Sequence, residues 1–306
     1  MITLSSGLSY FDLDFMDLPR IIAAGVVHGP GGVAIIDPGP SSTLPRLRSA
    51  LATAGLTLND VTTILLTHIH LDHAGATGTL VREYPRIRVC VHEKGAPHMA
   101  NPEKLLASAG RVYGNAMGRL WGEVLPVPRS SMDVLQGGER IVVGTRTFDV
   151  QYTPGHASHH VSFFDRDSGI AFVGDTAGVR LMHGGFVMPP TPPPDVDLEA
   201  WHHSLGLIDR WRPETLFLTH FGPSMPVGPH LGALRDHIVL TSSLVKRSLE
   251  RDGEDADREA WFADQMRGEL TRRMNEADTH AYEVAGRFDM NWRGLARYFR
   301  KKNATP

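Results

Sequence analysis

A short histidine-rich segment constrains this chain more than any other feature. The stretch THIHLDHAG directly follows the apolar, β-branched run 61–66, which predicts a buried strand. A strand that ends at Thr67 can pass into a tight loop whose alternate imidazoles converge on one point, while the next two polar residues face a neighbouring point. The loop places four side chains of metal-binding type within six residues, namely His68, His70, Asp72 and His73. Imidazole and carboxylate together suit zinc, iron or manganese.

Three later residues stand in similar settings. Each follows a strand-like run and has a glycine close by, a combination that predicts a turn at the end of a strand. They are His156 in YTPGHASHH, Asp175 in GIAFVGDTAG and His220 in TLFLTHFGP. In a layered α/β fold, rigid strands position such side chains and the following loops leave them accessible. We therefore expect these three residues to complete the metal coordination.

In this order the residues resemble the metallo-β-lactamase superfamily, whose pattern H-x-H-x-D-H, then His, then Asp, then His is matched without a gap. The resemblance spans about residues 20–225 and includes IIDPGPSS, in which Asp37 is expected to support the site rather than to bind metal. It implies an αββα sandwich with two metals. It also implies the ligand sets: His68, His70 and His156 for one metal, Asp72, His73 and His220 for the other, and Asp175 as the bridge.

The ligand set has a clear chemical consequence. Two divalent ions bring four positive charges, and Asp72, Asp175 and a bridging hydroxide would remove three, so the centre stays net positive. Such a centre lowers the pKa of bound water and stabilises an oxyanion on an attacked carbonyl or phosphoryl group. Asp72 and Asp175 are thus predicted to be catalytic as well as metal-binding. Zinc is expected first, with iron and manganese compatible.

Three reactions fit this centre. The first is hydrolysis of a small thioester, ester or lactone, because the chain resembles hydroxyacylglutathione hydrolases and lactonases. The second is phosphodiester cleavage, as in the superfamily's nucleases, although only 44 residues separate Asp175 from His220 and leave no room for a large inserted domain. The third is a mononuclear iron enzyme resembling the persulfide dioxygenases, against which the two complete half-sites argue.

Composition is compatible with a cytoplasmic enzyme, and the expected partner is a small-molecule substrate. The 306 residues are 42% hydrophobic, enough for a large core, and the net charge of −3 gives no general attraction to nucleic acid, which is not expected as a partner. The N-terminus lacks the early basic region of a secretory peptide, and no apolar run approaches membrane-spanning length. The single cysteine, Cys90, lies in a strand-like run and is expected to be a buried apolar residue.

Periodicity predicts two domains. Residues 1–228 alternate strands and helices, with helices expected over 44–54, 76–84 and 198–210 and strands over 140–150, 161–164 and 170–173. Residues 229–306 favour helix, with candidates at 230–251, 258–275 and 279–302. This C-terminal helical extension could pack on the main domain and supply a homodimer surface. Its last 20 residues carry a basic excess of five, which suits the end of a helix.

Two segments are candidates for substrate contact. Residues 92–128 carry apolar side chains at mostly helical spacing and could form a lid, or could simply pack a helix against the sheet. The glycine- and proline-rich stretch after Asp175 should be a stiff loop beside the metals. Its candidate substrate contacts are His183, Phe186 and Met188. His159 and His160 are expected to support the ligands or to belong to the core.

Overall fold

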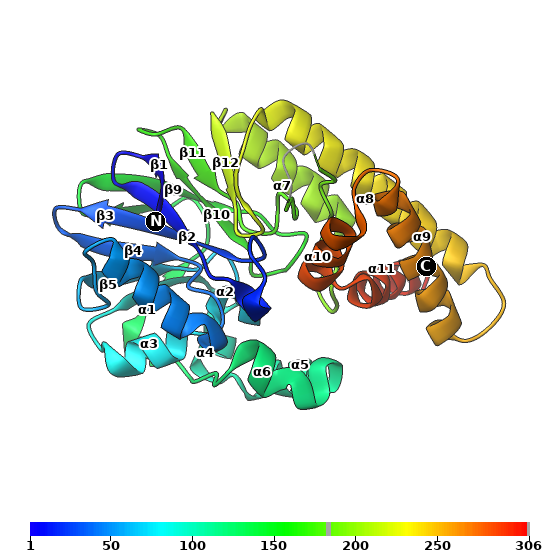
Figure 1. The fold of residues 1–306 in the computed structure, drawn as a ribbon, viewed down its shortest axis with the longest axis horizontal. Helices are drawn as coiled ribbons and strands as arrows, with labels where there is room; N and C mark the ends of the chain where they lie inside the picture. Colours follow the sequence, from blue (N-terminus) through cyan, green and yellow to red (C-terminus); the bar gives the residue numbers. More distant parts are fainter. Residues whose placement is uncertain (182–184, 305–306) are drawn as a thin grey trace.

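The fold contains two β-sheets that pack face to face (Figure 1). The ends of their strands hold the segments that carry the site residues. The computed structural model describes residues 1–181 and 185–304. The first sheet has the order β1-β2-β3-β4-β5-β6-β7. Its strands are β1 (Ile2–Ser5), β2 (Leu8–Asp12), β3 (Ala23–Gly29), β4 (Gly32–Ile36), β5 (Val61–Leu65), β6 (Arg88–His92) and β7 (Met132–Leu135). From β4 to β7 each neighbouring pair is parallel, so these strands end at one edge of the sheet.

The second sheet has the order β13-β12-β11-β10-β9-β8. Its strands are β8 (Arg140–Val143), β9 (Arg146–Tyr152), β10 (Val161–Asp165), β11 (Ile170–Phe172), β12 (Thr215–Leu218) and β13 (Gly222–Ser224). The pair β11–β12 is parallel, and the other neighbours are antiparallel. Buried side chains from both sheets, among them Ile36, Leu65, Phe148 and Phe163, form one apolar layer between them.

Helices cover the outer face of each sheet, which confirms the predicted αββα sandwich. The helices are α1 (Leu44–Thr53), α2 (Leu71–Ala74), α3 (Thr77–Glu83), α4 (Ala96–Ala100), α5 (Glu103–Tyr113), α6 (Met117–Trp121), α7 (Leu198–Arg210), α8 (Val227–Leu249), α9 (Asp255–Thr271), α10 (Glu276–Gly286) and α11 (Phe288–Asn303). Leu47 and Leu51 of α1 join the core outside the first sheet, and Trp201 and Leu205 of α7 join the core outside the second.

Two expected elements are each divided in the structure. The strand expected over 140–150 is a hairpin of β8 and β9 that turns at Gly144, whose φ of 58° is easy only for glycine. The helix expected over 279–302 is two helices, α10 and α11, because Arg287 adopts a φ of 36°. Gly286 beside it packs so closely on Met188 that a Cβ would lie 1.9 Å from the Met188 methyl carbon.

The C-terminal helices are tied to the loop before α7. Asn291 of α11 accepts a hydrogen bond from the backbone N–H of Thr191 (2.7 Å) and Tyr282 of α10 donates one to the carbonyl of Phe186 (2.6 Å). The basic end of α11 is not free, since Arg300 pairs with Asp255 and Lys302 pairs with Glu199. In Figure 1 the helices α8 to α11 therefore gather on one side of the sandwich, next to α7. Over the part of the chain that is described, the structure contains no helix that is both long and apolar enough to cross a bilayer.

Candidate metal centre

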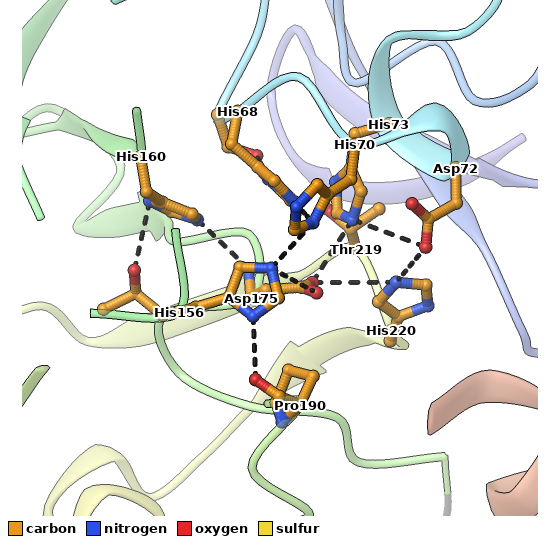
Figure 2. A network of polar contacts seen from close by, with 12 residues as sticks. His68, His70, Asp72, His73, His156, His160, Asp175, Pro190, Thr219 and His220 are labelled. Atoms are coloured by element: carbon orange, nitrogen blue, oxygen red, sulfur yellow. Dashed lines mark hydrogen bonds and ion pairs between the residues drawn. The ribbon is translucent and has the colours of Figure 1, made fainter. Parts of the chain in front are cut away.

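All seven residues expected as metal ligands lie together in the structure (Figure 2). The loop after β5 and the short helix α2 carry His68, His70, Asp72 and His73. The other three follow strands β9, β11 and β12, as their sequence settings predict. Glycine permits two of these turns. Gly155 and Gly174 have φ of 143° and 44°, and each lies immediately before a member of the set, His156 and Asp175.

Four of the five histidines face the centre with Nε2 because Nδ1 is bonded elsewhere. The Nδ1–H groups of His156 and His220 donate to the carbonyl oxygens of Pro190 (2.8 Å) and Ile21 (2.6 Å). That of His73 donates to Oδ2 of Asp37 (2.8 Å), and Nδ1 of His68 lies 3.1 Å from Oγ1 of Thr67. Such outer bonds fix the tautomer and leave a lone pair for a metal.

Three imidazole nitrogens crowd one point. Nδ1 of His70 lies 3.0 Å from Nε2 of His68 and 3.0 Å from Nε2 of His156. One hydrogen can serve only one of these two contacts, so lone pairs would face each other unless a cation lies between them. Burial, reinforced by neighbouring histidines, lowers the pKa of His70 to about 4 and the pKa of His68 well below its usual value. Neutral imidazoles at neutral pH are ready to bind a cation.

Asp175 lies between the two groups of histidines. Its Oδ2 is 3.5 Å from Nε2 of His156, and its Oδ1 is 3.3 Å from Nε2 of His73 and 3.6 Å from Nε2 of His220. Burial alone would raise the pKa of Asp175, but these three imidazoles hold it well below the usual range. The carboxylate is therefore ionised and can contact a cation on either side.

The second group combines two histidines with Asp72. Oδ2 of Asp72 is 3.4 Å from Nε2 of His220 and 3.9 Å from Nε2 of His73. Although burial opposes charge, His73 lowers the pKa of Asp72 to about 2, and the carboxylates of Asp175, Asp37 and Asp72 raise the pKa of His73 well above normal. The proton that His73 retains in this arrangement occupies the place a metal ion would take.

Buried polar atoms that lack a hydrogen bond test whether a metal fits this site. Nε2 of His73 and Oδ1 of Asp175 are buried and lie 3.3 Å apart as an ion pair, yet neither makes a hydrogen bond with any described residue. Buried polar atoms are normally paired, and an exception calls for an ion or a function. Three sets of residues could each hold an ion, because the ligand atoms within each set lie within 4.8 Å of one another. The sets are His68, His70 and His156; His68, His73 and Asp175; and Asp72, His73 and His220. The donor set therefore fits divalent metal.

Buried side chains behind the ligands hold them in place. Asp37 accepts hydrogen bonds from the Thr67 backbone (2.8 Å), the Thr67 hydroxyl (2.7 Å) and the Thr219 hydroxyl (2.8 Å) in addition to His73. His160 accepts from the backbone N–H of Asp175 (3.2 Å), and His159 lies nearby at 3.5 Å from the backbone nitrogen of Ile69. The sequence predicted supporting roles for Asp37 and His160 but gave no signal for Thr219.

Of the three residues expected to touch substrate, the structure describes Phe186 and Met188, and both lie away from the pocket. His183 is outside the described residues. Phe186 and Met188 are interior side chains, exposed by 1% and 0%. Phe186 stacks on the ring of His237, and Met188 packs on Gly286, because the loop turns these two side chains toward the C-terminal helices. Neither side chain lines the pocket beside the metal centre. Both pack in the interior instead of facing the space where a substrate would bind. Cys90 is buried, as expected.

Two pockets meet at the ligand set. One, of about 160 Å³, reaches His70, His156 and Asp175 and is bounded by α5, residues 190–194 and the start of α11. The other, of about 520 Å³, reaches His220 and lies between residues 15–22, α6 and α10. Asp72, Tyr113, Trp121, Ala285 and Arg287 line both. Sequence periodicity could not reveal that Arg287 and its neighbours reach the site, because a contact across more than 200 residues leaves no local pattern.

The fold and the ligand cluster together define a metal-dependent hydrolase. The family model described as the metallo-beta-lactamase superfamily matches residues 18–220, so the chain belongs to this superfamily. It is 28% identical over 214 residues to a metallo-beta-lactamase fold-containing protein of Sulfurisphaera tokodaii, covering 69% of this chain and 77% of that protein. It is 30% identical over 146 residues to hydroxyacylglutathione hydrolase of Legionella pneumophila (strain Lens), covering 48% of this chain and 43% of that enzyme.

One solved structure is similar over nearly the whole chain. A metallo-beta-lactamase family protein from Thermus thermophilus superposes with a TM-score of 0.73, covering 99% of this chain and 96% of that one at 22% sequence identity. Because this coverage extends past residue 220, the likeness of fold includes the C-terminal helices as well as the sandwich.

Proposed function

We propose that the protein uses two divalent metal ions to hydrolyse the carbonyl group of a small thioester, ester or lactone. The observation that carries the proposal is the arrangement of seven ligand side chains in two groups that meet at Asp175. One ion would be held by His68, His70 and His156, and the other by Asp72, His73 and His220. The ligand types favour zinc, and iron or manganese would also suit them.

When bound, the two ions supply an activated water as nucleophile and a Lewis acid for the carbonyl oxygen. The protein supplies position and proton transfer. The Asp72 side chain is 24% exposed, whereas Asp175 is 6% exposed, so Asp72 is the carboxylate that a substrate can reach. Asp72 would accept the proton that the attacking water loses on bonding to the carbonyl carbon. It would return this proton to the leaving sulfur or oxygen when the carbon–sulfur or carbon–oxygen bond breaks.

The two pockets support cleavage of a substrate in two parts. They meet at Asp72, so a carbonyl placed there would have its acyl group on one side and its leaving group on the other. Tyr113 and Arg287 stand between them, with the guanidinium 5.4 Å from the ring centre. This arrangement favours a small two-part substrate over a polymer.

Phosphodiester hydrolysis is the second candidate, because the same metal chemistry serves phosphoryl transfer. A nucleotide would need cations for its phosphates in the pocket. Apart from the histidines, the basic side chains among the described residues that line the two pockets are Arg119, in the larger pocket alone, and Arg287, in both. Asp289 already accepts hydrogen bonds from Nε of Arg287 (2.8 Å) and from its Nη2. A mononuclear iron enzyme is disfavoured because it would leave the second group of ligands without a use.

Proton release by metal-loaded protein tests the proposal. The substrates are a thioester, a lactone and an activated phosphodiester, and the blank is Asp175→Ala. Asp264→Ala, at a side chain that is 70% exposed, is the matched control. We expect the wild-type protein and Asp264→Ala to turn over the carbonyl substrates, and Asp175→Ala to be inactive. Phosphodiester-only turnover, or full activity of Asp175→Ala, would contradict the proposal.

A further inference from the structure

Helix α5 has an apolar face that the rest of the protein leaves partly open. None of its residues is fully buried, although Leu105, Ala109 and Val112 recur at the spacing of one helical face. These three side chains line the pocket of about 160 Å³, together with Tyr113 at the end of the helix. An amphipathic helix usually buries its apolar face in the core. Here Leu105 and Ala109 pack only partly on the core, and the surface that they leave open lines a space beside the metal centre.

The opposite wall is also apolar and is firmly held. It consists of Pro190, Pro192, Pro193 and Pro194 with Met290 of α11. Thr191, within this run, bonds to Asn291 through its backbone N–H (2.7 Å) and its hydroxyl (3.0 Å), so the proline segment is fixed to α11. The wall therefore offers a preformed apolar surface, and binding to it costs little ordering.

Part of the pocket lining is the metal centre itself. His70, His156 and Asp175 line it together with the apolar side chains, and we call these three residues its floor. The nearest cation, Arg287, is occupied by Asp289 and lies against the Tyr113 ring. Between the apolar walls, away from the metal centre, a charged group would lose its hydration without gaining a free side-chain partner from the described lining, which is costly. An apolar group attached to a reacting carbonyl would fit both the walls and the floor.

We infer that this pocket binds the acyl part of the substrate, and that this part is a short, uncharged, apolar chain. The inference rests on the proposed function and deepens it by naming the acyl class. A cavity of about 150 Å³ holds a molecule of the size of benzene, so a pocket of about 160 Å³ takes roughly six non-hydrogen atoms. The remainder of the substrate then lies in the larger pocket on the His220 side.

The chain offers a matched pair of variants on one helix. Ala109→Phe places an aromatic ring in the pocket, whereas Ala107→Phe places the same ring on the exposed face of α5. Val112→Ala enlarges the pocket and should favour a longer chain. Thermal unfolding of each variant checks that the fold is retained.

The first measurement needs no activity. Linear alcohols from ethanol to octanol are titrated into metal-free protein by calorimetry. Affinity should rise about fourfold for each added methylene and level off near six carbons. Ala109→Phe should abolish this dependence, and Ala107→Phe should keep it. Affinity that does not depend on chain length, or equal effects of the two variants, would overturn the inference.

The second measurement is turnover of nitrophenyl esters of increasing acyl length by metal-loaded protein. The expected kcat/KM has its maximum at a short chain, and Ala109→Phe shifts it to acetate. If the alcohols bind as described but no ester is turned over, the hydrolase proposal is refuted and the assignment of the apolar pocket is retained. Ester turnover with no dependence on acyl length would overturn the acyl pocket and leave the hydrolase proposal standing.

Discussion

Oδ2 of Asp37 lies 2.8 Å from Nδ1 of His73, and both side chains are buried. This bond joins the turn after β4 to the ligand loop after β5 and turns Nε2 of His73 toward Asp175. Because Asp37 also accepts from Thr67 and Thr219, one carboxylate aligns segments that are 182 residues apart in the chain. The geometry of the centre thus depends on a residue that contacts none of the space a metal would occupy.

Asp37→Ala is expected to weaken metal binding by about 10–100-fold, because outer partners of ligating histidines have effects of that size. It should also lower the free energy of unfolding by about 3–5 kcal/mol, since it removes one partner of a buried pair. Equilibrium dialysis and urea unfolding measure the two effects. Asp133→Ala, at an exposed partner of Arg88, is the control. Wild-type metal affinity in Asp37→Ala would contradict the supporting role.

Gly174→Ala should disturb the site from its backbone. A Cβ at Gly174 would lie 2.5 Å from Oγ1 of Thr67 and 2.7 Å from Nε2 of His160, and the residue has a φ of 44°. We expect a loss of about 1–3 kcal/mol in unfolding free energy, with weaker metal binding. Gly110→Ala is the matched control, because a Cβ there meets open space in helix α5 and should stabilise by about 0.5–1 kcal/mol. The idea fails if both substitutions change stability in the same direction.

His230 should make stability depend on pH without involving the metal centre. Nε2–H of His230 donates to the carbonyl of Ala177 (2.8 Å) and Nδ1 accepts from Ser224 (2.8 Å), so the neutral ring is fully bonded. Burial lowers the pKa of His230 to about 4, whereas the ordinary pKa of an exposed histidine is 6.5. The unfolded state therefore takes up the proton first. The stability contributed by the neutral ring is present above pH 6.5 and is lost as the pH falls toward 4.

Between pH 7 and pH 5 this single residue should cost about 2 kcal/mol of unfolding free energy. Urea unfolding of metal-free protein measures the cost, with His230→Gln as the comparison. The variant should be less stable at pH 7 and should lose less stability on acidification. An identical pH dependence in the two proteins would show that His230 is not held neutral.

The clustering of the seven candidate ligands was predictable because each lies on a segment that follows a strand and is marked by its local sequence. The helix over 198–210 was likewise predictable from periodicity alone. The substrate side was not, because proximity to Asp175 in sequence does not determine which way a loop faces. Phe186 and Met188 turn inward, while Arg287 and Met290 come from the far end of the chain to line the pocket. Packing between distant segments decides such placements.

The central claim is that two metal ions work together at one site, and a metal titration tests it most directly. Metal-free protein is titrated with Zn²⁺ while hydrolysis of a short-chain thioester is followed at each addition. The account predicts that activity and bound metal both reach their plateau at two ions per chain. A plateau of both at one ion per chain, or turnover that is independent of metal, would contradict it.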